Sequence, residues 1–211
     1  MLTWEERKVE IDAYLGEWIK PVFSKRSIDT INIFMANREK ISQSLSAAIF
    51  SANETALPLF DLGKKQRIKH IQFSYLFSAA LLKELLLRVD LYDAGYYEDL
   101  TDVKSYWDYK VLFPYITEDM EQLQTELSKL FPQIKRYEIL DFRMYYHVAV
   151  FALLGEILKE IVADDSFATV IGDLYESEVT ISYGGYQDHS IVLAMINGRL
   201  ANGLFSNKDP S

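Results

Sequence analysis

The sequence predicts an α+β fold that is predominantly helical, with helices packed around one buried central helix at about 138–162. Between Met144 and Gly155 that segment is apolar on every helical face, so other helices have to wrap it. Residues 85–92 alternate apolar and polar side chains, as a half-buried strand does. Residues 178–196 form two such runs around a glycine-rich turn, which predicts an antiparallel hairpin. The alternative is an all-α fold, because a helix through residue 89 would also bury an apolar face.

Helical periodicity predicts most of the other elements. Apolar residues spaced three and four apart predict two helices before residue 53, the first ended by Pro21, and together they indicate an α-hairpin. A loop is expected at 53–63, and the helical period resumes at about 68–79. Two more helices are expected, one at 106–113 that Pro114 ends and one at 117–130.

Neither a linker nor a repeat interrupts this pattern, so we expect one domain at 1–197 and a flexible C-terminal tail at 198–211. The apolar run of the central helix lies between Arg143 and Glu156. That is shorter than the roughly 20 apolar residues of a membrane span. We therefore expect no association with a membrane.

The composition narrows the classes of function. With 22 Lys plus Arg against 31 Asp plus Glu, the formal charge is −9, which disfavours nucleic-acid binding and speeds encounter with a basic protein. The chain has no cysteine, which excludes disulfides, thiolate zinc sites and a cysteine nucleophile. Its three histidines are dispersed, so no metal or other cofactor is expected. The charged N-terminus has no apolar signal segment, and the expected location is the cytoplasm.

The most suggestive segment is 90–108, which holds six acids, one base and five aromatic residues. Tyrosine and tryptophan provide rigid contact area with a polar tip, and acids among them suit a surface that receives a basic protein. The competing interpretation is a solvated acidic loop whose tyrosines cover the edge of the core. Metal binding is disfavoured, because the pattern of a calcium loop is absent. The predicted partner-binding residues are Tyr92, Asp93, Tyr96, Tyr97, Glu98, Asp99, Asp102, Tyr106 and Trp107.

Two histidines are weaker candidates. His147 in the central helix could be a general base or a ligand, but no carboxylate lies three or four residues away, so a core histidine bonded to another helix is favoured. At the hairpin tip His189 neighbours Asp188 and Tyr186. Adjacent strand residues point to opposite faces, so a polar turn is favoured there.

A basic patch at residues 64–69 is a third candidate. It could bind an anion if it began a helix, where backbone N–H groups are free. The glycine spacing of a phosphate-binding loop is absent, so a solvated first helical turn is preferred. The patch consists of Lys64, Lys65, Arg67 and Lys69.

These observations favour a cytoplasmic, non-enzymatic interaction protein that binds a basic protein partner. An inhibitor of the immunity or antitoxin type is its most concrete form. The alternative is an enzyme whose site brings together carboxylates from Asp93 to Asp102 with His147 or His189. A third class, a self-associating structural subunit, would be indicated by a large exposed apolar patch. The sequence leaves the oligomeric state open.

Overall fold

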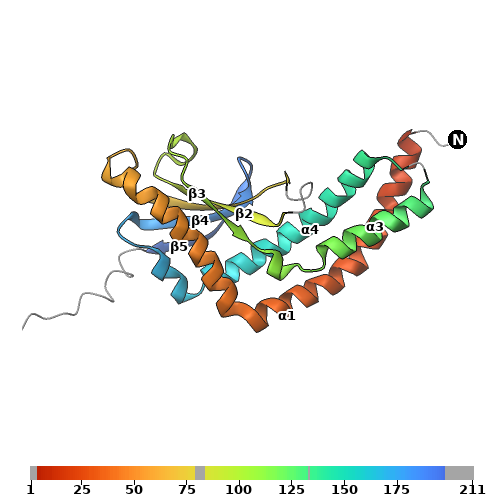
Figure 1. Ribbon diagram of the computed structural model, residues 1–211, viewed down its shortest axis with the longest axis horizontal. Helices are drawn as coiled ribbons and strands as arrows, with labels where there is room; N and C mark the ends of the chain where they lie inside the picture. The colour runs from red at the N-terminus through yellow and green to blue at the C-terminus, as the bar shows by residue number, and fades with distance from the viewer. Residues whose placement is uncertain (1–3, 79–83, 133, 198–211) are drawn as a thin grey trace, which may run out of the picture.

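The computed structural model describes residues 4–78, 84–132 and 134–197, without the side chains of Trp4, Arg136 and Ile139. The fold is α+β, as predicted, and the predicted tail at 198–211 lies outside the described residues (Figure 1). The helices and strands are α1 (Trp4–Asp61), β1 (Ile68–Tyr75), β2 (Leu86–Tyr92), β3 (Lys104–Asp108), α3 (Ile116–Leu130), α4 (Arg136–Val162), β4 (Tyr175–Gly185) and β5 (Ser190–Asn197).

The described strands form one five-stranded sheet in the order β3-β2-β1-β4-β5. Strands β1 and β4 are parallel and the other pairs are antiparallel. The strand predicted at 85–92 and the hairpin predicted at 178–196 are confirmed as β2 and as β4 with β5, and the all-α alternative is wrong. The expected separate β elements are joined into one sheet because β1 lies between them.

The helix predicted at 68–79 is wrong over its first eight residues, which form the central strand β1. Its core-facing side chains Ile71 and Phe73 are buried, and so are Gln72 and Ser74 on the opposite face. Residues 71–75 alternate apolar and polar side chains as a strand does, but Ile68, Ile71 and Tyr75 are also spaced three and four apart, so the same segment fits a helical period. Residue 79 lies outside the described part of the chain.

The short helix predicted at 106–113 is also wrong. Tyr106 and Trp107 belong to β3, where Trp107 faces the core and Tyr106 faces outward, and only Lys110–Leu112 forms a single 3₁₀ turn. Tyr106 and Trp107 are compatible with a helix in the sequence, but in the fold they are adjacent residues of an edge strand and point to its two opposite faces.

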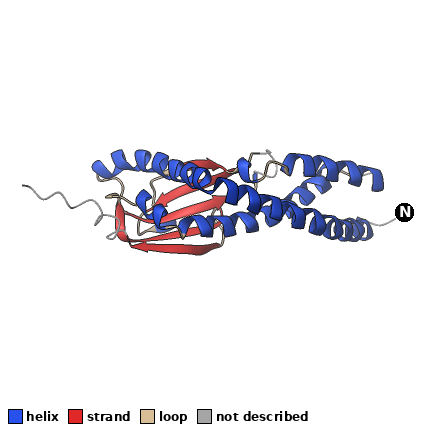
Figure 2. Ribbon diagram, turned by 90° about the horizontal axis from the view of Figure 1, so that it is seen from below, coloured by secondary structure: helices blue, strands red, loops and turns tan. Residues whose placement is uncertain are grey.

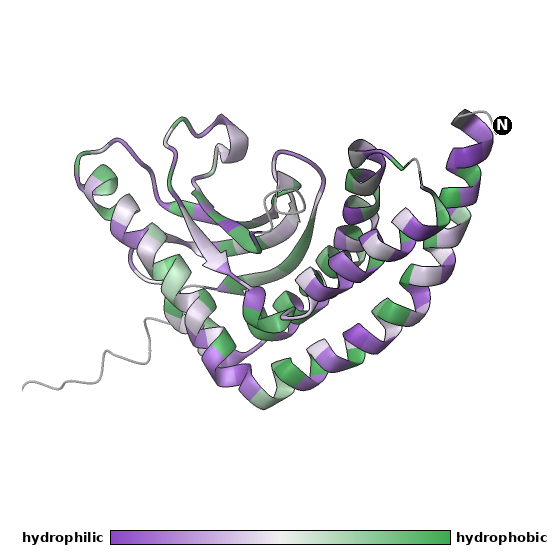
Figure 3. Ribbon diagram, turned by 45° about the vertical axis from the view of Figure 1, so that its right-hand side comes forward, coloured by the Kyte–Doolittle hydropathy of each residue, from purple (hydrophilic) through white to green (hydrophobic). Residues whose placement is uncertain are grey.

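Helix α1 is one long bent helix, so the predicted α-hairpin is wrong and most of the expected loop at 53–63 is helical. Pro21 and Pro58 lie inside it without ending it. The helix bends at Asn37, whose backbone leaves the helical region (φ −126°, ψ 19°) and whose side-chain Nδ2 donates to the carbonyl of Ile33 at 2.9 Å. Such a local side-chain bond competes with the helical ladder. The bend gives α1 its V shape (Figure 3).

The C-terminal halves of α1 and α4 cover one face of the sheet (Figure 2). At α4, Gly155 lies so close to Tyr183 of β4 that an added Cβ would be 2.8 Å from the ring. The Tyr183 hydroxyl donates to the carbonyl of Phe151 at 2.7 Å. At α1, Trp107 Nε1 donates to Ser44 Oγ at 2.9 Å. The core-facing residues of the strands are thereby buried, and the alternate residues face away from both helices.

The first half of α1, α3 and the start of α4 pack together at the other end of the molecule (Figure 1). The rings of Trp18 and Phe23 contact Tyr146, at centroid distances of 6.4 and 5.9 Å. The helix predicted at about 138–162 is confirmed as α4, but its burial on every face is not. Tyr145 is 56% exposed and Val148 is 54% exposed, because this half of α4 extends beyond the sheet.

Candidate functional site

The segment between β2 and β3 folds over the sheet face that α1 and α4 leave open. Asp99 holds it in place, because its carboxylate accepts from Lys65 Nζ and from the backbone N–H groups of Thr101 (2.9 Å) and Asp93 (3.1 Å). The side chains of Lys65 and Asp99 are 1% and 2% exposed. Burial alone would raise the pKa of Asp99, but the hydrogen bonds from Lys65 and Thr101 outweigh it and hold this pKa below its usual value. Asp99 is therefore part of the framework.

Three tyrosines of this segment pack on one another above the sheet. The Tyr92 ring lies 5.2 Å from Tyr96 and 5.5 Å from Tyr97, and the Tyr96 and Tyr97 rings are 4.2 Å apart. Tyr96 has a positive φ of 52°, a conformation uncommon for an aromatic residue, and its hydroxyl donates to Gln72 Oε1 of β1 at 2.8 Å. The Tyr96 ring also contacts His70 at 4.8 Å. Burial raises the pKa values of Tyr92 and Tyr97, so both keep neutral hydroxyls at pH 7.

An ion-pair network borders these tyrosines on β2 and β3. Arg88 donates to Asp90 at 2.7 Å and to Asp102 at 3.0 Å, and its guanidinium lies 4.2 Å from the ring centre of Tyr186 at the hairpin tip. Asp102 also pairs with Lys104. Asp90 is buried, and this burial raises its pKa although Arg88 donates to it. The network therefore neutralises Asp90 and Asp102, two of the six acids in the segment 90–108.

Eight of the nine predicted residues lie on or beside this open face and are not equally accessible, whereas Trp107 faces α1 on the other side of the sheet. Asp99 and Trp107 are buried and bonded within the fold. Sequence reasoning missed Arg88, Gln72 and Tyr186 on the same face. The alternation of β2 already placed Arg88 on the same strand face as Tyr92. No local pattern connected Gln72 or Tyr186 to that face. The half-buried residues are Tyr92, Asp93 and Tyr96, and the exposed residues are Tyr97, Glu98, Asp102 and Tyr106.

The other sequence candidates do not join this region into a catalytic group. Asp188 accepts from the backbone N–H of His189 at 2.8 Å and not from its ring. Within the basic patch, Lys65 pairs with Asp99, and Arg67 donates to the carbonyl of Asp173 at 2.6 Å. The patch follows α1 and leads into β1, so the preferred solvated first helical turn is wrong, and so is the alternative of an anion bound at a helix start.

His147 is buried and lines a small pocket of about 30 Å³, together with residues of α3, the segment 110–114, Leu85 and Arg143. Its Nδ1 bonds the carbonyl of Arg143 in the same helix at 2.7 Å, not a neighbouring helix as expected. A carbonyl only accepts, so Nδ1 carries the proton. Within the described residues, Nε2 of His147 and Nε of Arg143 have no hydrogen-bond partner. None of the carboxylates from Asp93 to Asp102 lines this pocket.

We predict that His147 makes the protein less stable as the pH falls from about 7 to 5. Burial, with Arg143 nearby, lowers the pKa of His147, so the unfolded chain binds this proton more readily than the folded one. Its share of stability is therefore complete above the unfolded pKa of about 6.5 and is lost as pH falls through the folded pKa. The His147→Leu variant should show a shallower slope of unfolding free energy against pH in urea titrations.

His70 shares this pH window, because burial and Lys69 lower its pKa while Asp93 opposes the shift. The His70→Gln variant measures that share, and the double variant should remove both. Each histidine contributes at most about 1.4 kcal/mol per pH unit. An unchanged slope in His147→Leu would show that its ring can be protonated without opening the pocket. The charged groups lining that pocket are Lys110, Glu121 and Arg143.

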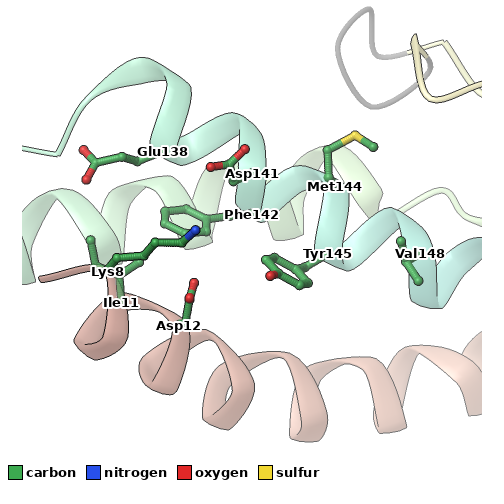
Figure 4. A pocket seen from close by; sticks show the side chains of 9 residues that line it. All are labelled: Lys8, Ile11, Asp12, Glu138, Asp141, Phe142, Met144, Tyr145 and Val148. Carbon is green, nitrogen blue, oxygen red and sulfur yellow. The ribbon is translucent and has the colours of Figure 1, made fainter. Parts of the chain in front are cut away.

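A larger groove lies between the first turns of α1 and the N-terminal half of α4 (Figure 4). Its volume is about 340 Å³. The floor is apolar, and charged side chains from both helices border it. It is lined by Lys8, Ile11, Asp12, Glu138, Asp141, Phe142, Met144, Tyr145 and Val148.

The structure bears on two classes of function, metal binding and membrane insertion. Within the described residues, no group of three or more histidine, aspartate or glutamate side chains is arranged to hold a metal ion. Among the helices of the described ranges, none has the length and apolarity that crossing a bilayer requires. Comparisons with family models, curated proteins and solved structures found no match. The fold class is α+β. The two candidate sites on it are the open sheet face and the groove between α1 and α4.

Proposed function

We propose that this protein is a cytoplasmic, non-enzymatic interaction protein that binds a basic protein partner through the open face of its sheet. The observation that carries the proposal is a group of tyrosines on that face, here named the tyrosine face. Tyrosine buries a large apolar body while its hydroxyl stays hydrated, which is why it is frequent at the centres of interfaces. The tyrosine face consists of Tyr92, Tyr96, Tyr97, Tyr106 and Tyr186.

Charge at the border of the tyrosine face supports a basic partner. Within the described residues, four carboxylates there have no cationic side chain within 4 Å, in contrast to Asp90, Asp99 and Asp102. These four charges are already part of the net charge of −9, and they concentrate negative potential beside the tyrosine face. Complementary charge of this kind speeds association more than it strengthens the final complex. The four carboxylates belong to Asp93, Glu98, Asp108 and Asp188.

An inhibitor of a basic effector, as in immunity and antitoxin proteins, is the most concrete form of this proposal. Such an inhibitor needs a rigid, preorganised surface, because ordering loops on binding costs affinity. The Lys65–Asp99 pair and the Tyr96–Gln72 bond supply that rigidity. The self-associating alternative draws on apolar side chains of the edge strand β5, where Ile191, Val192 and Met195 are about 60% exposed.

The test is capture of a basic partner from the native lysate by the tagged protein at low and high salt. We expect capture at low salt that weakens at high salt. Tyr97→Ala should weaken capture about 10- to 30-fold, the range for an interface anchor. The pair Glu98→Gln and Asp188→Asn should reduce low-salt capture several-fold through slower association.

The matched control carries Glu10→Gln and Glu17→Gln, which change charge equally on exposed positions of α1. It should capture the partner as well as the unchanged protein does. Capture that is equal in all variants would overturn the tyrosine face as the binding surface. Size-exclusion chromatography of the same samples would reveal self-association as a dimer that forms with no partner present.

A further inference from the structure

The groove between α1 and α4 combines acidic and apolar side chains in a way that suits one kind of ligand. Three carboxylates, from Asp12, Glu138 and Asp141, line the groove with one ammonium, from Lys8, and the Arg7 guanidinium pairs with Glu138. The floor is formed by the buried side chains Ile11 and Phe142. A groove of about 340 Å³ lies within the usual size range of ligand sites, roughly 300–1,000 Å³.

The walls of the groove add exposed apolar surface. Tyr145 and Val148 are both more than half exposed on the side of α4 that faces the groove. Exposed apolar residues beside unbalanced carboxylates favour a ligand that carries a positive charge on an apolar stem. Lysine and arginine side chains have this character, because their methylene stems pack on apolar surface while the charged head stays polar.

Lys8 already shows that the groove accepts such a side chain. In Figure 4 its stem passes beside Phe142, and its nitrogen points between Asp12 and Asp141. Within the described residues, however, no ion pair shorter than 4 Å holds Lys8 to either carboxylate. The Lys8 side chain therefore occupies the place of a cationic ligand without a close ion pair, and a better placed cation can displace it.

Glu138 supplies the third carboxylate, at one end of the groove. Its side chain is 4% exposed, and its Oε2 accepts from Arg7 Nη2 at 3.3 Å and from the backbone N–H of Lys135 at 2.5 Å. Its Oε1 is buried and has no donor among the described residues. The Arg7 Nε is likewise buried without an acceptor in the described ranges, and Figure 4 shows the Glu138 carboxylate directed away from Lys8, so Glu138 adds negative charge at the end of the groove but is not itself open to a ligand.

From these observations we infer that the groove binds a lysine or arginine side chain from a basic partner segment. The inference deepens and rests on the proposed function, since it gives the same basic partner a second contact. The groove lies at the helical end of the molecule and the tyrosine face at the sheet end (Figures 1 and 2). A partner that reaches both would have to lie along the long axis.

The test uses small probes, so that it does not depend on the tyrosine face. Nα-acetyl-arginine amide is titrated into the ¹⁵N-labelled full chain and compared with Nα-acetyl-citrulline amide, its uncharged isostere. We expect the arginine compound to shift amides of α1 and α4 around the groove, with a dissociation constant on the order of 1 mM, because few groups make contact. The citrulline compound should bind about 5-fold more weakly or worse.

Two variants should change the affinity in opposite directions. Lys8→Gln removes the competing cation and should tighten binding of the arginine compound about 3- to 5-fold, whereas Asp141→Asn should weaken it by a similar factor. Both positions are exposed, so neither change threatens the fold. Glu10→Gln, on α1 but outside the groove, should leave the affinity unchanged.

Equal shifts with both compounds, or equal affinities in the two variants, would overturn the inference. The outcome is separate from that of the lysate experiment. If Tyr97→Ala loses capture and the arginine and citrulline compounds bind the groove equally, only the tyrosine face is supported. Charge-selective binding in the groove with unchanged capture by Tyr97→Ala supports the groove alone.

Discussion

Replacing Asp119 with alanine should destabilise the protein by about 3 kcal/mol or more, because the change breaks a buried ion pair. Asp119 of α3 is 1% exposed and accepts from Arg26 of α1, at 3.1 Å from Nε and 2.6 Å from Nη2. It also accepts from the hydroxyl of Tyr146 in α4 at 2.5 Å. One carboxylate thus joins the three helices of the helical end.

The cost arises from the groups that the substitution leaves behind. The Tyr146 hydroxyl is fully buried and would lose its partner, which alone costs roughly 1–3 kcal/mol. The Arg26 guanidinium, with a side chain 20% exposed, would lose its closest counter-charge. It would remain fixed over the ring of Tyr115, 4.6 Å from the centroid.

Urea unfolding checks this prediction, with a lower midpoint and an unchanged slope as the expected result. Glu118→Ala is the matched control, because Glu118 is next in sequence and lies 3.8 Å from the same guanidinium but is 79% exposed. It should change the free energy of unfolding by less than about 0.5 kcal/mol. A loss in Asp119→Ala as small as that in Glu118→Ala would contradict the prediction. It would mean that solvent satisfies the Arg26 guanidinium when Asp119 is removed.

The sequence predicts those elements whose pattern is local. Helix α4 and the β4–β5 hairpin are defined by long runs with one period and a clear turn, so both were predicted correctly. Strand β1 was not, because Ile68, Ile71 and Tyr75 also fit a helical period, although residues 71–75 alternate apolar and polar side chains. The bend of α1 depends on Asn37, whose side chain gave no signal that distinguishes it from other exposed asparagines.

The site divides in the same way. Its tyrosines were predictable because most are adjacent in the chain, between 92 and 106. Its charge balance was not, because Lys65 lies 34 residues before Asp99 in the sequence and contacts it only in the folded sheet. The groove was missed completely, since its two walls come from α1 and α4 and no spacing rule relates residues about 130 positions apart.

Asp99→Asn should be as costly as the change at Asp119, about 3–5 kcal/mol, and it should cost more than Lys65→Met. Without the carboxylate charge, the Lys65 ammonium stays buried with only the Thr101 hydroxyl, at 2.9 Å, to satisfy it. Without Lys65, Asp99 keeps its bonds from the backbone of Thr101 and Asp93. We therefore expect Lys65→Met to cost only about 1–3 kcal/mol.

The pH dependence provides a second readout for the same pair. Because the folded state lowers the pKa of Asp99, its contribution is complete above the unfolded pKa of about 3.9 and is lost as pH falls through the folded value. Asp99→Asn should therefore lose less stability on acidification below pH 4 than the unchanged protein does. Asp102→Asn, on a side chain 58% exposed, is the matched control and should cost less than about 1 kcal/mol at pH 7.

Partner capture then separates the role of Asp99 in the fold from a role in contact. In Asp99→Asn the tyrosines lose the anchor of their segment, so capture should fall even at temperatures where the protein remains folded. In Lys65→Met the segment keeps its backbone bonds, and capture should be largely retained. If both variants are folded and Lys65→Met loses capture as completely as Asp99→Asn, the buried pair itself, and not the turn that Asp99 holds, positions Tyr96 and Tyr97.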